Sequence, residues 1–311
     1  MKLYKGIAQI AKAPERVVAT IGNFDGVHVG HQEIFRLVKD HAKRIQGTAL
    51  AITFRPHPIM ALSPVASPHL LNSYEEKMEI MENYGLDVIV EEPFSREFSN
   101  TTPEQFVTDY LLNRLHAHAI YLGYDFSFGK DREGSVELLQ NIAKANGIEI
   151  TVVPPFKVSD QIVSSSLVRK KLEEGAMEEV KALLGRPFFV RGPVLRGDGR
   201  GKQIGVPTAN LSLTMRKLPR LGVFATRSIW HGKSYPSITN IGTNPTFKGD
   251  GTDLPVKIET HFFDFDKDLY GDEITVEFHA FLRAEQKFSG VEALLTQINK
   301  DKSEARKILG N

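Results

Sequence analysis

The sequence predicts an α/β domain with a parallel sheet, followed by an antiparallel β-barrel that ends in one helix. The length of 311 residues corresponds to two domains of ordinary size. Strand-like and helical runs alternate up to about residue 184, which is typical of a parallel sheet with crossover helices. After Gly185-Arg186-Pro187, short β-type runs separated by Gly, Pro and Asn dominate. We therefore expect domains at 1–184 and 185–311.

The first half shows the order of elements expected of a parallel sheet. Short β-branched and apolar runs predict strands, and apolar positions at helical spacing predict helices. The segment Thr102-Pro103-Glu104-Gln105 combines an N-cap residue, a proline at the first helical position and a capping-box glutamine, so a further helix is expected there. The predicted strands cover residues 17–21, 48–54, 87–90, 118–122 and 148–153, and the other helices cover 31–44, 74–84 and 135–145.

The second half is dominated by β-type runs. Residues 223–230 and 234–241 flank His231-Gly232-Lys233, which predicts a hairpin turn. Two more strands are expected at 257–263 and 273–282. Apolar residues at helical spacing predict one terminal helix from about 290 to 309. These elements together predict an antiparallel barrel with a single helix.

Composition and charge exclude several kinds of site. Lysine and arginine number 39 and aspartate and glutamate 38, a net charge of +1, so we expect neither nucleic acid nor a membrane as a partner. The absence of cysteine excludes disulfides, thiolate nucleophiles, cysteine-ligated zinc and iron–sulfur clusters. No signal peptide and no apolar run of membrane-spanning length is present, which predicts a cytoplasmic protein. The sequence does not indicate an oligomeric state.

A glycine-rich string directly after the first strand has the features of a phosphate-binding turn. It extends from Gly22 to His31 and leads into a predicted helix, whose free N–H groups favour phosphate. His28 and His31 share one helical face, where both rings can hydrogen-bond phosphate oxygens. This pattern suits phosphoryl or nucleotidyl transfer; a tight turn, surface histidines and an incomplete metal site are the alternatives. The other string residues that we expect near a nucleotide are Gly22, Asn23, Asp25 and Gly30.

Further candidate residues lie later in the first half. Ser164 and Ser165 precede a helical run and are either plain N-cap residues or a second phosphate cradle, with Arg169 one turn later to hold a triphosphate oxygen. Asp125 stands between aromatic residues and is either a buried cap or a polar anchor for a ligand. Phe128 alternates with a second phenylalanine, so one of the two can face a ligand.

The second half begins with a basic, glycine-rich segment. Ten lysines and arginines between Arg186 and Lys233 are opposed only by Asp198, which is compatible with a solvated face, a nucleic-acid patch or a phosphate site. Interleaved glycines and cations favour the phosphate site. No Gly-Lys-Ser/Thr follows and no helix is expected here, so this is not a P-loop. The predicted cradle comprises Gly197, Gly199, Gly201, Lys202 and Gly205.

Oxygen donors and a carboxylate follow this segment. The Thr208 hydroxyl and the Asn210 carboxamide are hard ligands suited to Mg²⁺ beside a nucleotide, and a capped Pro-Thr turn is the alternative. Glu259 lies in the strand-like stretch Val256–His261. Its carboxylate can accept a proton from a substrate hydroxyl, as the base of a phosphotransferase does, although most such acids are solvated.

The motifs of the first half resemble one known family. Residues 20–32 resemble the FAD synthetase module of bacterial bifunctional riboflavin kinase/FMN adenylyltransferases, and residues 54–58, 123–129 and 163–169 agree with it in order. The resemblance implies a nucleotidylyltransferase-type, Rossmann-like parallel sheet. It also implies that His28 and His31 stabilise charge on the reacting phosphates and that Asp125 and Phe128 contact the flavin.

The motifs of the second half resemble the riboflavin kinase module of the same family. The matching stretches include residues 206–210, 222–224, 240–246, 259–261 and 281–283. The resemblance implies that Thr208 and Asn210 hold Mg-ATP and that Glu259 is the base for the riboflavin 5′-hydroxyl. Arg283, Phe224 and the terminal helix would border the flavin, although Phe224 stands where the family often has tyrosine.

Together the resemblances cover nearly the whole chain and imply two reactions. ATP phosphorylates riboflavin to FMN in the second domain, and a second ATP adenylylates FMN to FAD in the first, with release of pyrophosphate. Three alternatives stay open: only one active site, a different phosphorylated acceptor for the first domain, or a flavin- or RNA-binding regulator without catalysis.

Overall fold

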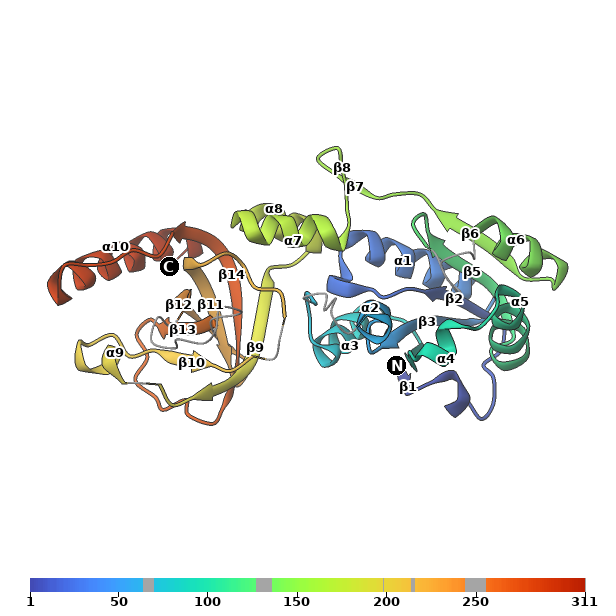
Figure 1. The fold of residues 1–311 in the computed structure, drawn as a ribbon, viewed down its shortest axis with the longest axis horizontal. Coiled ribbons are helices and arrows are strands. Elements are labelled where there is room, and N and C mark those ends of the chain that lie inside the picture. Colours follow the sequence, from blue (N-terminus) through green and yellow to red (C-terminus); the bar gives the residue numbers. More distant parts are fainter. Residues whose placement is uncertain (64–69, 127–135, 198, 214–215, 244–255, 311) are drawn as a thin grey trace. The chain divides into compact units, whose positions relative to one another are not determined.

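The computed structural model describes residues 1–63, 70–126, 136–197, 199–213, 216–243 and 256–310 (Figure 1). Contacts divide the chain into two units, Met1–Ser165 and Ser166–Asn311. Helices α7 (Ser165–Glu174) and α8 (Met177–Leu184) thus group almost entirely with the second unit. The domain boundary at 184/185 stays a prediction. No helix in the described ranges is long and apolar enough to cross a membrane.

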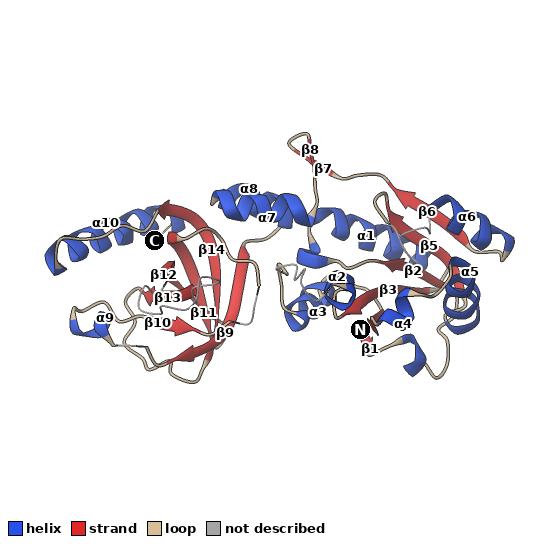
Figure 2. Cartoon of the chain, in the orientation of Figure 1, coloured by secondary structure: helices blue, strands red, loops and turns tan. Residues whose placement is uncertain are grey.

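The first unit is built on a six-stranded sheet in the order β1-β4-β3-β2-β5-β6, with every neighbouring pair parallel (Figure 2). This confirms the predicted α/β class. The strands are β1 (Lys2–Tyr4), β2 (Val17–Ile21), β3 (Thr48–Arg55), β4 (Val88–Pro93), β5 (Ala117–Gly123) and β6 (Glu149–Val153), and a separate hairpin pairs β7 (Lys157–Val158) with β8 (Gln161–Ile162).

Helices connect the parallel strands. The longest, α1 (Val29–Arg44), packs against β2, β3 and β5. The others are α2 (Pro58–Leu62), α3 (Tyr74–Glu82), α4 (Arg96–Ser99), α5 (Pro103–Gln105), the π-helix η3 (Phe106–Arg114) and α6 (Val136–Ala145), with 3₁₀ turns η1 (Ile7–Gln9) and η2 (Asp25–Val27).

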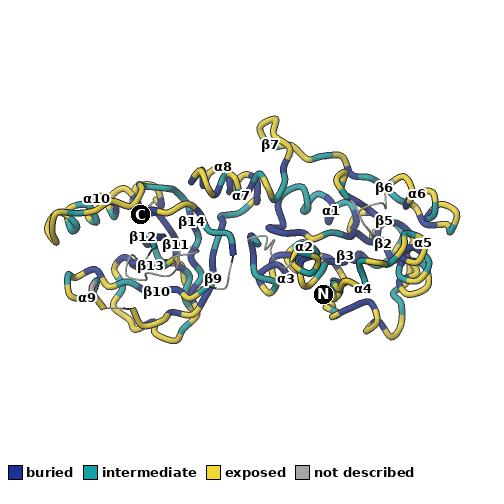
Figure 3. Tube along the Cα trace, viewed as in Figure 1, coloured by how far each residue is buried: buried dark blue, intermediate teal, exposed yellow. Residues whose placement is uncertain are grey.

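Local sequence explains most of these elements. All five residues of β2 are buried, as expected of a central parallel strand, and Figure 3 shows the contrast between the buried strands and the exposed β7–β8 hairpin. The predicted capping box is confirmed: the Gln105 backbone N–H donates to Thr102 Oγ1 at 3.2 Å, and the Thr102 N–H donates to Gln105 Oε1 at 3.1 Å. The short edge strand β1 was not predicted, because three residues carry too little periodicity.

The second unit is a closed barrel in the order β10-β13-β12-β11-β14-β9, with antiparallel pairing throughout. This confirms the predicted barrel. Its strands are β9 (Phe188–Leu195), β10 (Ala209–Leu211), β11 (Gly222–Trp230), β12 (Lys233–Thr243), β13 (Val256–Phe262) and β14 (Glu273–Arg283), and the predicted terminal helix is α10 (Val291–Leu309).

The predicted hairpin joins β11 to β12. Trp230 pairs with Lys233, so the loop consists of His231 and Gly232, with φ values of 47° and 73°. Two residues in the left-handed region give the turn whose twist matches antiparallel strands. The turn is one residue shorter than the sequence indicates, because Lys233 already belongs to the strand.

Hydroxyl groups and aromatic rings fill the barrel. Thr226 Oγ1 lies 2.8 Å from Ser237 Oγ and 2.9 Å from Thr239 Oγ1, which lies 2.9 Å from Thr260 Oγ1. All four side chains are fully buried, and each hydroxyl has a hydrogen-bond partner in a neighbouring hydroxyl. The ring of Phe224 packs beside this ladder against Phe278 and Phe281. The cavity described below therefore lies outside this packed interior.

Candidate active sites

The strand order of the first unit brings two loops to one edge of the sheet. From β2 the order runs through β3 and β4 on one side and through β5 and β6 on the other. The segments after β2 and β5 therefore meet at the carboxyl edge, where open parallel sheets bind ligands. The first segment is the string from Gly22 to His31, and the second contains Asp125.

The string after β2 has a strained backbone. Phe24 and Val27 adopt φ values of 49° and 42°, and Gly26 adopts 80°. A left-handed conformation costs a non-glycine residue about 1–3 kcal/mol and is least favourable for a β-branched residue. Gln32 Nε2 donates to the Val27 carbonyl at 2.8 Å and offsets part of this cost. Strain held by such contacts is typical of functional sites.

The two predicted histidines lie together at the start of α1. The His28 ring accepts the backbone N–H of His31 at 3.4 Å, and the two rings stack with centroids 3.5 Å apart. Burial, with smaller electrostatic contributions from His28 and Lys77, holds the pKa of His31 well below 6.5, so the ring is neutral at pH 7. Within the described part of the chain, the buried His31 Nδ1 has no hydrogen-bond partner. The neutral ring can still offer one N–H to a phosphate oxygen.

The structure brings some of the other predicted residues to this string. Asp25 is buried, and its Oδ1 accepts the Leu71 N–H at 2.9 Å. The Ser165 hydroxyl donates to the Asp25 carbonyl at 2.9 Å, which ties the start of α7 to the string. Gly30 lies against the His28 ring, since a Cβ there would stand 3.2 Å from its Nδ1.

For the remaining predicted residues of the first site that lie in the described ranges, the structure gives the position in the fold. Gly22 and Asn23 lie within the string, and Asp125 is exposed in the turn after β5. Ser164 directly precedes α7, and Arg169 lies in α7 within the second unit. Phe128 lies outside the described residues. Their roles stay predictions.

One charged residue beside the string was not predicted. Lys77 of α3 is buried, and its Nζ donates to the Asn23 carbonyl at 3.1 Å and to Thr53 Oγ1 at 2.8 Å. Its helix contains several charged residues, and nothing in the sequence singles out Glu76 and Lys77 as the two that are buried.

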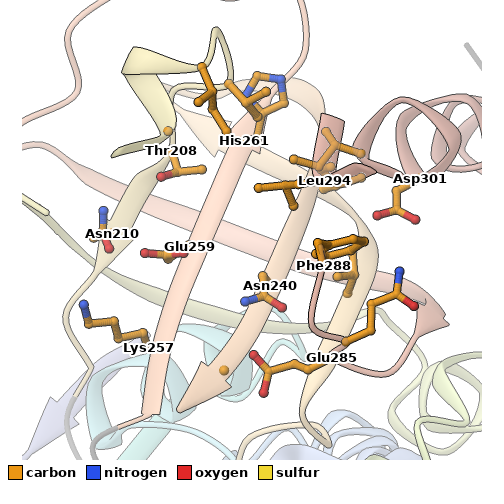
Figure 4. Close-up of a pocket in the computed structure, with 18 of the residues that line it drawn as sticks. Thr208, Asn210, Asn240, Lys257, Glu259, His261, Glu285, Phe288, Leu294 and Asp301 are labelled. Carbon is orange, nitrogen blue, oxygen red and sulfur yellow. The ribbon is translucent and has the colours of Figure 1, made fainter. Parts of the chain in front are cut away.

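The second unit contains a cavity of about 410 Å³ on the face of the barrel beside α10. It is lined by residues of the strands β10, β11, β12, β13 and β14, by the glycine-rich loop, by the segment after β14 and by α10. Figure 4 shows Thr208, Asn210 and Glu259 on one side, with Phe288 and Asp301 on the other. A pocket with oxygen donors on one side and an aromatic ring on the other suits a ligand with polar and flat parts.

Strand register places five cavity residues in one row. Asn210 of β10 pairs with Glu259 of β13, which pairs with Asn240 of β12. Asn240 pairs with Val223 of β11, which pairs with Arg283 of β14. Residues directly opposite each other in adjacent strands share one face. The predicted base Glu259 therefore lies between two carboxamides, of which Asn240 was not singled out from the sequence.

The glycine-rich loop approaches the predicted metal ligands closely. A Cβ on Gly197 would stand 2.3 Å from Asn210 Nδ2, and a Cβ on Gly201 would stand 2.4 Å from the Val206 carbonyl oxygen. Gly199 and Gly205 adopt φ values of 69° and 77°. Each of these glycines is thus required by contact or conformation. The exposed Lys202 lies in this loop.

The sequence-based expectation that this loop contains no helix is wrong. The structure has a one-turn helix, α9 (Arg200–Gln203). Four residues with two flanking left-handed glycines leave no helical periodicity to detect. The absence of a following Gly-Lys-Ser/Thr still separates this loop from a P-loop.

His261 fixes the segment that contains Thr208. Its Nδ1–H donates to the Pro207 carbonyl at 2.7 Å, and its ring lines the cavity. Burial lowers the pKa of His261 below 6.5, against the opposing effect of this hydrogen bond. A neutral ring with this tautomer leaves Nε2 as an acceptor.

Arg283 is held by a buried carboxylate that was not predicted. Its Nε and Nη2 donate to Asp301 of α10 at 3.0 and 2.8 Å, and Gln297 Nε2 donates to the same carboxylate at 2.8 Å. This bidentate pair fixes the arginine beside Phe288. By contrast, Phe224 is fully buried and does not line the cavity, so the structure does not place it with Arg283.

We expect Asp301→Ala to damage the cavity and the stability of the second unit together. Removing one partner of a buried ion pair leaves an uncompensated charge, which costs about 3–5 kcal/mol. Asp264→Ala is the matched control, because Asp264 also pairs with an arginine, Arg306 of α10, but is exposed; such pairs contribute about 0–1 kcal/mol. Denaturant unfolding of both variants tests this, and equal losses would contradict it.

Comparisons with known proteins match each half of the chain to a family model. The FAD synthetase family model matches residues 10–167, and the riboflavin kinase family model matches residues 184–309. Proteins named bifunctional riboflavin kinase/FMN adenylyltransferase from Listeria monocytogenes and Bacillus subtilis are 36% and 34% identical to this chain; the alignments cover 93% and 97% of it, and 91% and 95% of those proteins.

A solved structure shares the whole fold. The crystal structure titled macrolide-efflux protein from Streptococcus pneumoniae superposes with a TM-score of 0.88 at 30% identity over 98% of each chain. Two family models thus match in the order that the motifs predict, and the relatives extend over nearly the full length. The resemblance seen in the motifs is confirmed, and the chain belongs to the bifunctional riboflavin kinase/FMN adenylyltransferase family.

Proposed function

We propose that the two sites divide the two reactions of this family between them. The enzyme phosphorylates riboflavin to FMN and adenylylates FMN to FAD, using one ATP in each step. We assign the kinase reaction to the barrel cavity and the adenylyl transfer to the string from Gly22 to His31. The observation that carries this assignment is the row in which Glu259 lies between Asn210 and Asn240 within the cavity.

In the kinase reaction, Glu259 is the proposed general base. Its carboxylate accepts the proton of the riboflavin 5′-hydroxyl as that oxygen attacks the γ-phosphorus of ATP. The bond from the γ-phosphorus to the bridging oxygen breaks, and ADP leaves. The glycine-rich loop, with its close approach to Asn210, is the proposed contact of the ATP phosphates. Arg283, fixed by Asp301, borders the flavin.

The donors in the cavity fit magnesium brought in with the nucleotide. The Thr208 hydroxyl and the Asn210 carboxamide are hard oxygen ligands, and both line the cavity beside Glu259. Within the described residues, no group of three His, Cys, Asp or Glu side chains could hold a metal ion by itself. Bound Mg²⁺ would shield the negative charge of the phosphates, whose oxygens would complete its coordination.

In the adenylyl transfer, a phosphate oxygen of FMN attacks the α-phosphorus of ATP, and pyrophosphate leaves. His28 and His31 are proposed to donate hydrogen bonds to the reacting phosphates, so no covalent enzyme intermediate forms. The start of α1 adds its N–H groups. Ser164 and Ser165 are the proposed second phosphate contact, supported by the bond from Ser165 to the Asp25 carbonyl. A cytoplasmic location, where ATP is abundant, suits both steps.

A chromatographic time course with riboflavin and excess Mg-ATP tests the assignment. We expect FMN to appear first and FAD to follow. FMN alone would mean that the first unit is inactive or needs another acceptor. Bound but unconverted riboflavin would favour the regulator that binds flavin without catalysis.

A further inference from the structure

Lys77 is a buried lysine beneath the nucleotide-binding string. It lies in α3 and is 6% exposed. Its Nζ donates to the Asn23 carbonyl and to Thr53 Oγ1, and it stands 5.5 Å from the centre of the Tyr74 ring. Thr53 Oγ1 in turn donates to the same Asn23 carbonyl at 3.1 Å. The lysine thus joins α3, β3 and the string in one network.

Burial of this ammonium has a free-energy cost that packing does not require. Desolvation lowers the pKa of Lys77 to about 8, opposed by the negative charges of Asp25 and Glu91 and reinforced by the positive charge of Arg55. An apolar residue of similar length would avoid this cost. The lysine nevertheless keeps its charge at neutral pH. This indicates that the charge or its hydrogen bonds have a functional role.

The contacts of the ammonium indicate what this role is. The Asn23 carbonyl belongs to the strained string, whose Phe24 and Val27 are in the left-handed region. A fixed carbonyl limits how this backbone can relax. The positive charge also lies near His31, where with burial and His28 it helps to keep that ring neutral.

We propose that Lys77 is a positioning residue for adenylyl transfer: its ammonium fixes the Asn23 carbonyl and thereby the string that presents His28 and His31 to the phosphates. This inference rests on the proposed assignment of adenylyl transfer to the string. Lys77 acts indirectly, through its hydrogen bond to the Asn23 carbonyl and through the effect of its charge on His31. The two effects can be separated, because Thr53→Val removes a hydrogen bond and keeps the charge.

We expect Lys77→Met to lower kcat/KM for FAD formation from FMN by about 10²-fold, since a small misplacement of reacting groups has effects of that size. Riboflavin phosphorylation, assigned to the second unit, should be unchanged, and denaturant unfolding of the variant reports whether the first unit is folded. Lys39→Met is the matched control, because Lys39 is an exposed lysine of the same unit. FAD formation by Lys77→Met within about threefold of the Lys39→Met rate would overturn the proposal.

The pH profile separates positioning from a purely structural role. In the unsubstituted protein FAD formation should fall above about pH 8, as Lys77 loses its proton, and Lys77→Met should lack this fall. On the acid side, the change in activity that accompanies protonation of His31 should occur at a higher pH in Lys77→Met, because His31 loses a positive neighbour and its pKa rises. The groups facing the ammonium from the adjoining elements are Asp25, Arg55, Tyr74 and Glu91.

Thr53→Val keeps the test decisive if Lys77→Met does not fold. It should reduce FAD formation less than tenfold and leave both sides of the pH profile in place, since the ammonium remains. Loss of the fall above about pH 8 in Thr53→Val, which keeps the ammonium, would refute the role of the charge. Failure of the unsubstituted protein to make FAD from FMN would instead disprove the assignment of the reaction itself.

Discussion

Glu259→Gln should abolish most riboflavin phosphorylation while FMN is still converted to FAD. The substitution preserves the shape of the side chain and its place between Asn210 and Asn240, but a carboxamide cannot accept the hydroxyl proton. Loss of a general base typically slows a reaction by about 10²–10⁴-fold. Separate assays of riboflavin to FMN and of FMN to FAD measure the two rates in one preparation.

Glu273→Gln serves as the control for this substitution. Glu273 lies in β14 of the same barrel but is exposed and does not line the cavity. We expect both activities of this variant to match those of the unsubstituted protein. If Glu259→Gln still made FMN at the control rate, the assignment of Glu259 as the base would be wrong, and the base would have to be sought elsewhere.

The second large effect is expected for His31→Ala, which should lower FAD formation by about 10²–10³-fold. Removal of one donor that stabilises charge in a transition state has effects of that size. The stacked His28 ring remains, and its acceptor for the cap of α1 is retained, so α1 should still form. FMN formation in the barrel should be unaffected, which the same pair of assays shows.

The pH of the assay matters for this comparison. The folded protein holds the pKa of His31 below 6.5, so stability is lost as the pH falls below that value, where the unfolded chain binds a proton that the folded one does not. Measurements at pH 7 or above avoid this loss. His118→Ala is the control, since His118 is an exposed histidine of the same unit. Collapse of FMN formation in folded His31→Ala would contradict the division of labour.

The sequence by itself determined both fold classes and the place of each candidate site along the chain. These features depend on local physics. Alternation in Val256–His261 places Glu259 and the apolar Ile258 on opposite faces, and the Thr102–Gln105 capping box begins a helix through bonds between neighbouring residues. Because such signals span only a few residues, they can be recognised without knowing what packs against them.

The tertiary structure alone decided which side chains meet. The row from Asn210 to Arg283 depends on the register of five strands, and except for the β11–β12 hairpin this register is set by pairing between segments that are far apart in sequence. Lys77 resembles any helical lysine until α3 packs beneath the string, and Phe224 resembles any strand aromatic until the barrel closes over it. Burial, charge state and contact arise only when distant elements pack together. For this reason the sequence could indicate candidate site residues but not which of them lie side by side.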